Sequence, residues 1–195
     1  MTYILADEPL TFGHYFAKGA EDRVGCRYSI ERTAASFAEN VREIESVFPN
    51  ASVVDTEALD RLQSTSDLES WIHFLKADLG AGAPTLMQLD VQWNRPWQQN
   101  ANAVVSTLAA AGWGYGIIYD GAPKQTSDDA WVQSAKQNIV AWESTVTTGP
   151  ANIMIQSWEP HPSRLLPETD PTTLPSLVDY YCRNGRYRGA CGTGT

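Results

Sequence analysis

The sequence predicts an α/β fold, a partial (β/α)8 barrel of the TIM type with five parallel βα units. Five short apolar segments alternate with five amphipathic segments along the 195 residues, which predicts parallel strands joined by right-handed crossovers. No glycine-rich phosphate-binding turn follows the first apolar segment, although a nucleotide-binding open sheet normally has one there. Polar residues also occupy one face of the third predicted strand, as the mouth of a barrel allows. An open, doubly wound parallel sheet is the alternative fold.

The first part of the chain contains two predicted strands and two predicted helices. Residues 3–6 form the first strand and residues 52–54 the second. A helix is predicted over residues 29–48, because apolar residues recur there at steps of four and three. Ser29 is its expected N-cap, and Ser66 is the expected N-cap of the next helix, whose apolar stripe ends at residue 79.

The alternation continues in the second part of the chain. The third strand is predicted over residues 85–94, where successive side chains point to opposite faces, so that Gln88, Asp90, Gln92 and Asn94 share one of them. The last two strands are predicted over residues 115–120 and 152–158. The remaining helices are predicted over residues 97–111, 127–146 and 173–181, with Ser127 as an N-cap.

We expect one domain over residues 1–181, followed by a disordered tail over residues 182–195 that is rich in glycine and arginine. The three cysteines, Cys26, Cys182 and Cys191, lack metal-site spacing. Cys182 and Cys191 would be able to form a bridge in an exported protein, but we expect an unpaired tail. A complete barrel takes about 250 residues. We therefore expect open sheet edges, which self-association of the chain would cover.

Charge and hydropathy exclude two classes of partner. Fourteen Lys and Arg residues against twenty-three Asp and Glu residues give a net charge of −9, so the chain repels a phosphate backbone and we expect no nucleic-acid partner. The uncharged stretch 96–119 is interrupted by polar residues and glycines, so we expect no membrane span. Asp7 and Glu8 precede any apolar run of signal length, so we expect a soluble protein without a signal peptide. The compartment is left open.

Acidic residues follow every predicted strand. They are Asp7, Glu8, Asp55, Glu57, Asp90, Asp120 and Glu159. The carboxyl ends of parallel strands meet on one face, where loops build the functional site. We therefore expect these carboxyl groups to share one cleft, although polar loops and helix caps also explain single acids at such positions.

Aromatic residues gather near the same strand ends. His14 lies in the first loop with Phe12 and Tyr15, and Trp93, Trp97, Tyr119 and Trp158 follow later strands. Flat rings beside carboxylates suit a sugar, whose C–H face stacks on the ring while its hydroxyl groups bind acids and amides. Trp71, Trp131 and Trp142 lie on helix stripes instead, and we expect them in the core.

The segment Ala6-Asp7-Glu8-Pro9 resembles the Asn-Glu-Pro motif that ends the fourth strand in clan A glycoside hydrolases. The resemblance covers residues 3–181 and implies that the five units match the fourth to eighth of a barrel. It implies that Glu8 is the acid/base and that Trp158 stacks on substrate. The chain departs from the family at Asp7, where the family has Asn, and at Asp120, where the family's nucleophilic Glu is expected.

We therefore expect a glycoside hydrolase-like protein that acts on or binds a carbohydrate, with Glu8 and Asp120 as the catalytic pair and no cofactor. The expected substrate contacts are Asp7, His14, Asp55, Glu57, Asp90, Gln92, Trp93, Tyr119, Trp158 and Glu159. One alternative is a non-catalytic carbohydrate-binding or vestigial barrel fragment. Another is a Mg²⁺-dependent barrel enzyme that holds its ion with Asp7 or Glu8, Glu57 and Asp90.

Overall fold

Five parallel strands form one sheet in the order β1-β2-β3-β4-β5. The strands are β1 (Thr2–Asp7), β2 (Ala51–Ala58), β3 (Leu86–Asp90), β4 (Gly114–Tyr119) and β5 (Asn152–Ile155). The helices are α1 (Ile30–Val47), α2 (Thr65–Leu79), α3 (Gln98–Ala110), α4 (Asp128–Thr145) and α5 (Leu174–Asn184), with short helices η1 (Thr11–Tyr15), η2 (Gly80–Gly82) and η3 (Arg188–Cys191). This computed structural model describes residues 2–16, 26–62 and 64–191.

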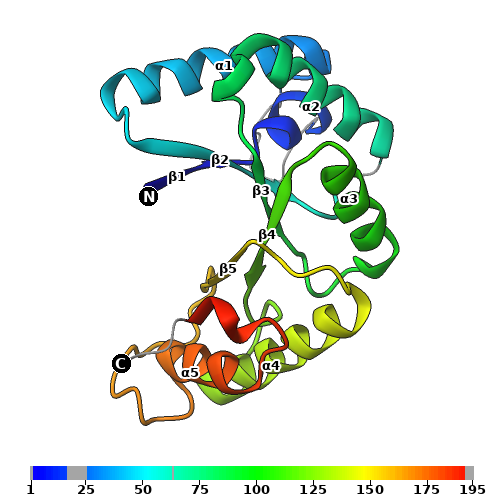
Figure 1. The fold of residues 1–195 in the computed structure, drawn as a ribbon. Coiled ribbons are helices and arrows are strands. Elements are labelled where there is room, and N and C mark those ends of the chain that lie inside the picture. The colour runs from blue at the N-terminus through cyan, green and yellow to red at the C-terminus, as the bar shows by residue number, and fades with distance from the viewer. Residues whose placement is uncertain (1, 17–25, 63, 192–195) are drawn as a thin grey trace.

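The sheet curls into a half-barrel, and the helices line its convex side (Figure 1). Each strand pairs with the strand that precedes or follows it in the sequence, whereas the strand order of a doubly wound sheet reverses at a switch point. The predicted α/β fold with five parallel βα units is confirmed in this form.

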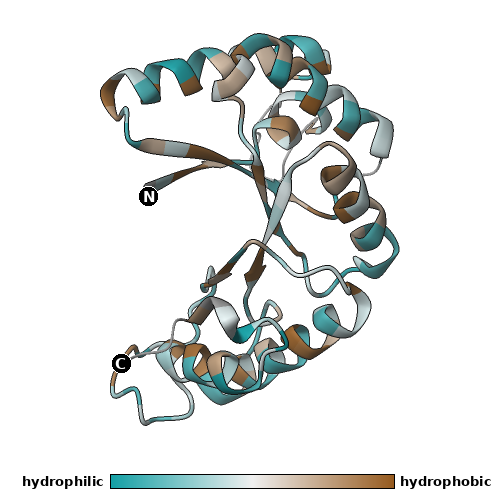
Figure 2. Cartoon of the chain, viewed as in Figure 1, coloured by the Kyte–Doolittle hydropathy of each residue, from teal (hydrophilic) through white to brown (hydrophobic). Residues whose placement is uncertain are grey.

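The apolar core fills the space between the strands and the helices. Figure 2 shows apolar residues along the strands and on parts of the helices. Trp71, Trp131 and Trp142 are fully buried in this layer, as predicted. The burial of these large rings holds α2 and α4 against the sheet, because apolar area removed from water is the main stabilising contribution.

Two of the three predicted N-caps are confirmed and one is corrected. Ser29 and Ser127 accept hydrogen bonds from backbone N–H groups in the first turns of α1 and α4. The N-cap of α2 is Ser64, whose Oγ accepts from the backbone N–H of Asp67 at 3.2 Å. Ser66 lies inside the first turn, because the helix begins at Thr65, one residue before it.

The third strand is shorter than predicted. It ends at Asp90, and the chain then turns, with the N–H of Arg95 donating to the carbonyl of Gln92 at 2.8 Å. The polar–apolar alternation continues to Asn94 in the sequence, but no neighbouring strand pairs with residues 91–94 in the described part of the sheet. Side-chain alternation therefore does not by itself set the end of a strand.

The segment 182–191, for which we expected disorder, is ordered. Cys182 at the end of α5 forms a disulfide with Cys191 in η3. Between them, the backbone N–H of Arg186 donates to Glu143 Oε2 at 2.8 Å and Tyr187 Oη donates to the carbonyl of Thr147 at 2.8 Å. Residues 192–195 of the expected tail lie outside the described residues.

Within the described residues, no helix is both long and apolar enough to cross a membrane.

Candidate functional site

A cavity of about 280 Å³ opens at the carboxyl ends of the strands, and we call it the acidic cavity. Its walls come from the loops after β1, β3, β4 and β5. The lining residues are Asp7, Glu8, Phe12, Asp90, Val91, Gln92, Trp93, Asp120, Gly121, Pro123, Trp158 and Glu159. The volume is near the lower end of the roughly 300–1,000 Å³ range of small-molecule sites, so the cavity is large enough for a small ring.

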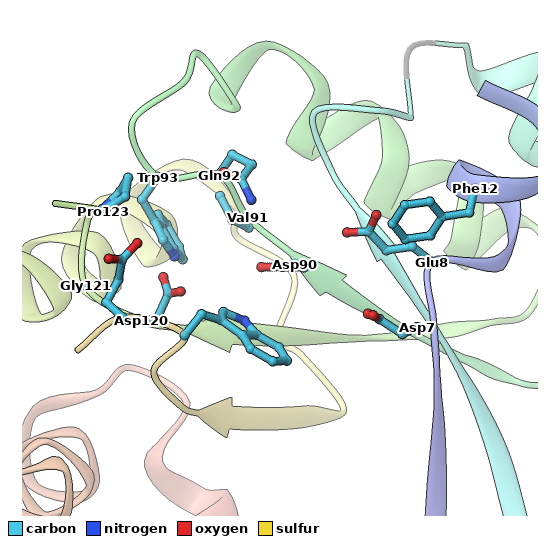
Figure 3. A pocket seen from close by; sticks show the side chains of 12 residues that line it. Asp7, Glu8, Phe12, Asp90, Val91, Gln92, Trp93, Asp120, Gly121 and Pro123 are labelled. Carbon is cyan, nitrogen blue, oxygen red and sulfur yellow. The ribbon is translucent and has the colours of Figure 1, made fainter. Parts of the chain in front are cut away.

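Figure 3 shows how three carboxyl groups are arranged in the acidic cavity. Glu8 lies beside Phe12 at one end, and Asp120 lies near Trp93 at the other. Asp90 lies between them, because β3 is nearer to the middle of the sheet than β1 or β4. Neighbouring strands are about 4.8 Å apart, so β1 and β3 are separated by roughly 10 Å along the sheet and by less across its curl.

Glu8 is held by an unusual backbone conformation. Its φ is 51°, in the left-handed region, which costs a non-glycine residue roughly 1–3 kcal/mol. Its N–H donates to the carbonyl of Thr56 at 2.7 Å, and its carbonyl accepts from the N–H of Phe12 at 2.9 Å. These two hydrogen bonds hold the residue in a conformation that lets its carboxyl group line the acidic cavity.

Burial and the negative charges of nearby carboxylates raise the pKa of all three carboxyl groups. Burial, aided by the negative charges of Asp7 and Asp90, raises the pKa of Glu8 to about 7. Burial, with Asp7 and Asp60 nearby, raises the pKa of Asp90 to about 6. Burial, together with Asp90, raises the pKa of Asp120 to about 8. At neutral pH Asp90 is therefore the most ionised of the three, and Asp120 the least.

Asp120 is positioned by the helix that follows its strand. Its carbonyl oxygen accepts a hydrogen bond from Nδ2 of Asn138 on α4 at 2.9 Å. Burial raises the pKa of the Asp120 carboxyl group, and the nearby Trp93 indole offsets part of this increase. The ring of Trp93 stacks on Tyr119, with centroids 6.0 Å apart.

Two aromatic side chains of the acidic cavity are open to solvent. Trp158 is 69% exposed and Phe12 is 40% exposed, and both line the cavity. Their loops follow β5 and β1, the two edge strands of the sheet. The acidic cavity therefore combines exposed aromatic rings, which offer an apolar surface to a ligand, with carboxyl groups, which bind polar hydrogens.

The cavity brings together eight of the twelve residues that we expected as the catalytic pair or as substrate contacts. They are Asp7, Glu8, Asp90, Gln92, Trp93, Asp120, Trp158 and Glu159. Sequence reasoning did not select Gly121 and Pro123 in the loop after β4, which also line the cavity. Their only signal was their position directly after a predicted strand.

Asp55 and Glu57, two of the expected substrate contacts, do not line the acidic cavity. Both are fully buried on the helix-facing side of β2, away from the acidic cavity. The carboxylate of Glu57 accepts hydrogen bonds from the N–H of Leu10 at 2.6 Å and from Oγ1 of Thr11 at 2.7 Å. The pair therefore anchors the start of η1 and the helix layer.

The magnesium hypothesis places Glu57 beside Asp90. Asp90 lines the acidic cavity, whereas Glu57 does not. In the described part of the chain, no group of three or more His, Cys, Asp or Glu side chains is arranged to hold a metal ion.

His14 and Tyr119 also lie outside the cavity lining. His14 Nδ1 hydrogen-bonds the carbonyl of Tyr28 at 2.7 Å. Tyr119 is fully buried behind Trp93. Both side chains therefore support the loops around the cavity and do not form its surface.

Comparisons with protein-family models, with curated proteins and with solved structures find no match to this chain.

Proposed function

We propose that the protein is a glycoside hydrolase-like protein that binds a carbohydrate in the acidic cavity and cleaves a glycosidic bond. The observation that carries this proposal is the meeting of Glu8, Asp90 and Asp120, each with a raised pKa, beside the exposed rings of Phe12 and Trp158. Glycoside hydrolysis needs one carboxyl group that keeps its proton and one that has lost it.

The order of the pKa values supports a division of roles. Glu8, with a pKa of about 7, keeps enough of its proton near neutral pH to act as the general acid. Asp90, with a pKa of about 6, is the ionised partner. Asp120, which we expected in that role, has a pKa of about 8 and suits a proton donor that hydrogen-bonds the substrate.

The reaction then balances with water as the only co-reactant. Glu8 donates its proton to the glycosidic oxygen while the bond from the anomeric carbon to that oxygen breaks. Asp90 accepts a proton from a water molecule, whose oxygen forms the new bond to the anomeric carbon. Retaining enzymes need carboxyl groups about 5 Å apart and inverting enzymes about 6.5–9.5 Å. Glu8 and Asp90 lie at the ends of strands that are not neighbours in the sheet, so we propose inversion.

The test of this function uses Glu8→Gln and Asp90→Asn, with Glu39→Gln on the exposed face of α1 as the matched control. Release of reducing sugar from oligosaccharides measures turnover, and quenching of tryptophan fluorescence measures binding. We expect each cavity variant to lose at least about 100-fold in kcat and to keep binding, while Glu39→Gln behaves as the unaltered protein. Binding without turnover in the unaltered protein would favour the non-catalytic alternative, and neither binding nor turnover would refute the proposal.

We also propose that the curled sheet is part of a TIM-type barrel and that a second copy of the chain covers its open edges. In the described residues β1 pairs only with β2, and β5 only with β4. Tyr3 and Leu5 on β1 are large apolar side chains with 43% and 40% exposure. Unpaired strand edges with apolar side chains favour pairing with another chain.

A further inference from the structure

A second cavity of about 250 Å³ adjoins the acidic cavity, and the two share Glu8, Phe12 and Gln92 as lining residues. The second cavity also contains Arg61 from the loop after β2 and Arg95 from the loop after β3. We call it the arginine pocket. A ligand that extends from one cavity into the other passes beside the carboxyl group of Glu8.

The two arginines are held by one carboxylate. Oδ2 of Asp60 lies 2.8 Å from Nη1 of Arg95 and 3.8 Å from Nε of Arg61. Asp60 is mostly buried, with 12% side-chain exposure, whereas about half of each arginine side chain is open to solvent. Asp60 therefore orients the guanidinium group of Arg95 through a hydrogen bond and attracts that of Arg61 through its charge.

Charge distinguishes the arginine pocket from the acidic cavity. Asp60, Arg61 and Arg95 together carry one net positive charge, and the shared Glu8 leaves that charge in place while it keeps its proton. The acidic cavity contributes five carboxyl groups, from Asp7, Glu8, Asp90, Asp120 and Glu159. A neutral sugar gains little from a positive charge beside the proton donor, whereas a substrate with an anionic group at this point would be bound by that charge. Guanidinium groups bind carboxylate and sulfate oxygens through paired N–H donors.

We propose that the arginine pocket binds an anionic substituent of the carbohydrate, so that the substrate is an acidic polysaccharide. The inference rests on the proposed function, because it assumes that a sugar occupies the acidic cavity. The sugar ring that carries the anionic group contacts Phe12, and the group reaches Arg61 and Arg95. Its neighbour across the glycosidic bond lies towards Trp158.

The test compares binding of matched oligosaccharides, measured by tryptophan fluorescence and calorimetry. The probes are oligogalacturonate against neutral galactose oligomers, glucuronate-containing oligomers against glucose oligomers, and sulfated galactan oligomers. We expect at least one acidic probe to bind about tenfold or more tightly than its neutral partner. The preference should weaken as sodium chloride is added, because salt screens exposed charges. The uronate and sulfate probes identify which anionic group is preferred.

The variants are Arg61→Gln and Arg95→Gln, with Arg183→Gln as the control. Arg183 is an exposed arginine on α5 that pairs with Asp179. Its replacement by Gln removes one positive charge from the protein, as each pocket variant does. We expect each pocket variant to lose the preference for the acidic probe while its affinity for the neutral probe is unchanged. Arg95→Lys keeps the charge without the paired donors and should retain part of the preference. Circular dichroism and thermal melting show whether each variant is folded.

The two proposals fail differently. If neutral and acidic probes bind equally, or if the folded pocket variants keep the preference, the inference is overturned and the proposed function remains. If no carbohydrate binds, the proposed function is refuted, and this inference with it.

Discussion

Nε1 of Trp71 on α2 donates a hydrogen bond of 2.8 Å to Oδ2 of Asp55 on β2, and both side chains are fully buried. Glu57 lies two residues further along the same strand, on the same face. Burial raises the pKa of Asp55 to about 7. Burial also raises the pKa of Glu57, and the negative charge of Asp55 raises it further. Two carboxyl groups in one dry layer do not both ionise readily, so the folded protein retains a proton there at neutral pH.

This buried pair predicts that stability falls as pH rises. Unfolded Asp and Glu titrate near pH 4, so between about pH 4 and pH 7 the folded chain binds more protons than the unfolded chain, and the free energy of unfolding decreases with pH. The raised pKa values of Glu8, Asp90 and Asp120 act in the same direction. We expect a lower Tm at pH 8 than at pH 5, measured by circular dichroism.

Asp55→Asn supplies the control for the pH effect. Its amide oxygen is able to accept the Trp71 hydrogen bond but does not titrate, so the decrease in Tm between pH 5 and pH 8 should become smaller. A Tm that is constant or rises over this range in the unaltered protein would contradict the buried-pair interpretation.

Under the proposed mechanism, the cavity carboxyl groups predict a narrow pH optimum for kcat/KM between about pH 6 and pH 7. We expect activity to fall below this range as Asp90 gains a proton and above it as Glu8 loses one, because their pKa values are about 6 and about 7. Asp7→Asn removes a negative charge that raises both pKa values, so both limbs of the profile should move to lower pH. A shift of only one limb would show that Asp7 does not act on both groups.

If the proposed hydrolysis takes place, the strand positions of Glu8 and Asp90 predict inversion at the anomeric carbon. The strand β2 separates β1 from β3, and inverting enzymes need the wider spacing of carboxyl groups, which leaves room for a water molecule. Proton NMR of the first sugar released, recorded before mutarotation, reports its anomeric configuration. Retention would instead indicate a nucleophilic carboxylate about 5 Å from the acid.

Gly121 is predicted to tolerate no larger side chain. A Cβ atom at this position would lie 2.6 Å from the buried indole ring of Trp131. We expect Gly121→Ala to cost about 1–3 kcal/mol in unfolding free energy, because overpacking displaces the ring or the loop. Gly82→Ala is the control, since its Cβ would meet its nearest neighbour, Oε2 of Glu45, at 3.5 Å. Equal midpoints of urea unfolding for the two variants would refute this packing argument.

The exposed edge of β1 predicts that the chain associates with itself. We expect the unaltered protein to elute as a dimer or larger species in size-exclusion chromatography with light scattering. The double variant Tyr3→Lys and Leu5→Lys should be monomeric, because charge on an edge strand opposes pairing. Val140→Lys removes another exposed apolar side chain, on α4, and should leave the association unchanged. A monomeric unaltered protein would refute the prediction.

Local pattern was sufficient to predict most of the secondary structure. The helical stripes, the caps Ser29 and Ser127, and the three core tryptophans depend on neighbouring residues or on a periodicity of a few residues. The convergence of Glu8, Asp90 and Asp120 also followed from the alternation of strands and helices, because the ends of parallel strands lie at one edge.

What the sequence by itself determined is the order of the elements and the set of acidic residues near the strand ends. The tertiary structure decided which of these acids enter the cavity. Asp55 and Glu57 turn to the helix layer and Asp90 to the cavity, because a shift of one residue along a strand exchanges the two faces of a sheet. The pKa order of the cavity groups, the joint placement of Arg61 and Arg95, and the Cys182–Cys191 bridge depend on burial and on contacts between distant segments, which local sequence does not contain.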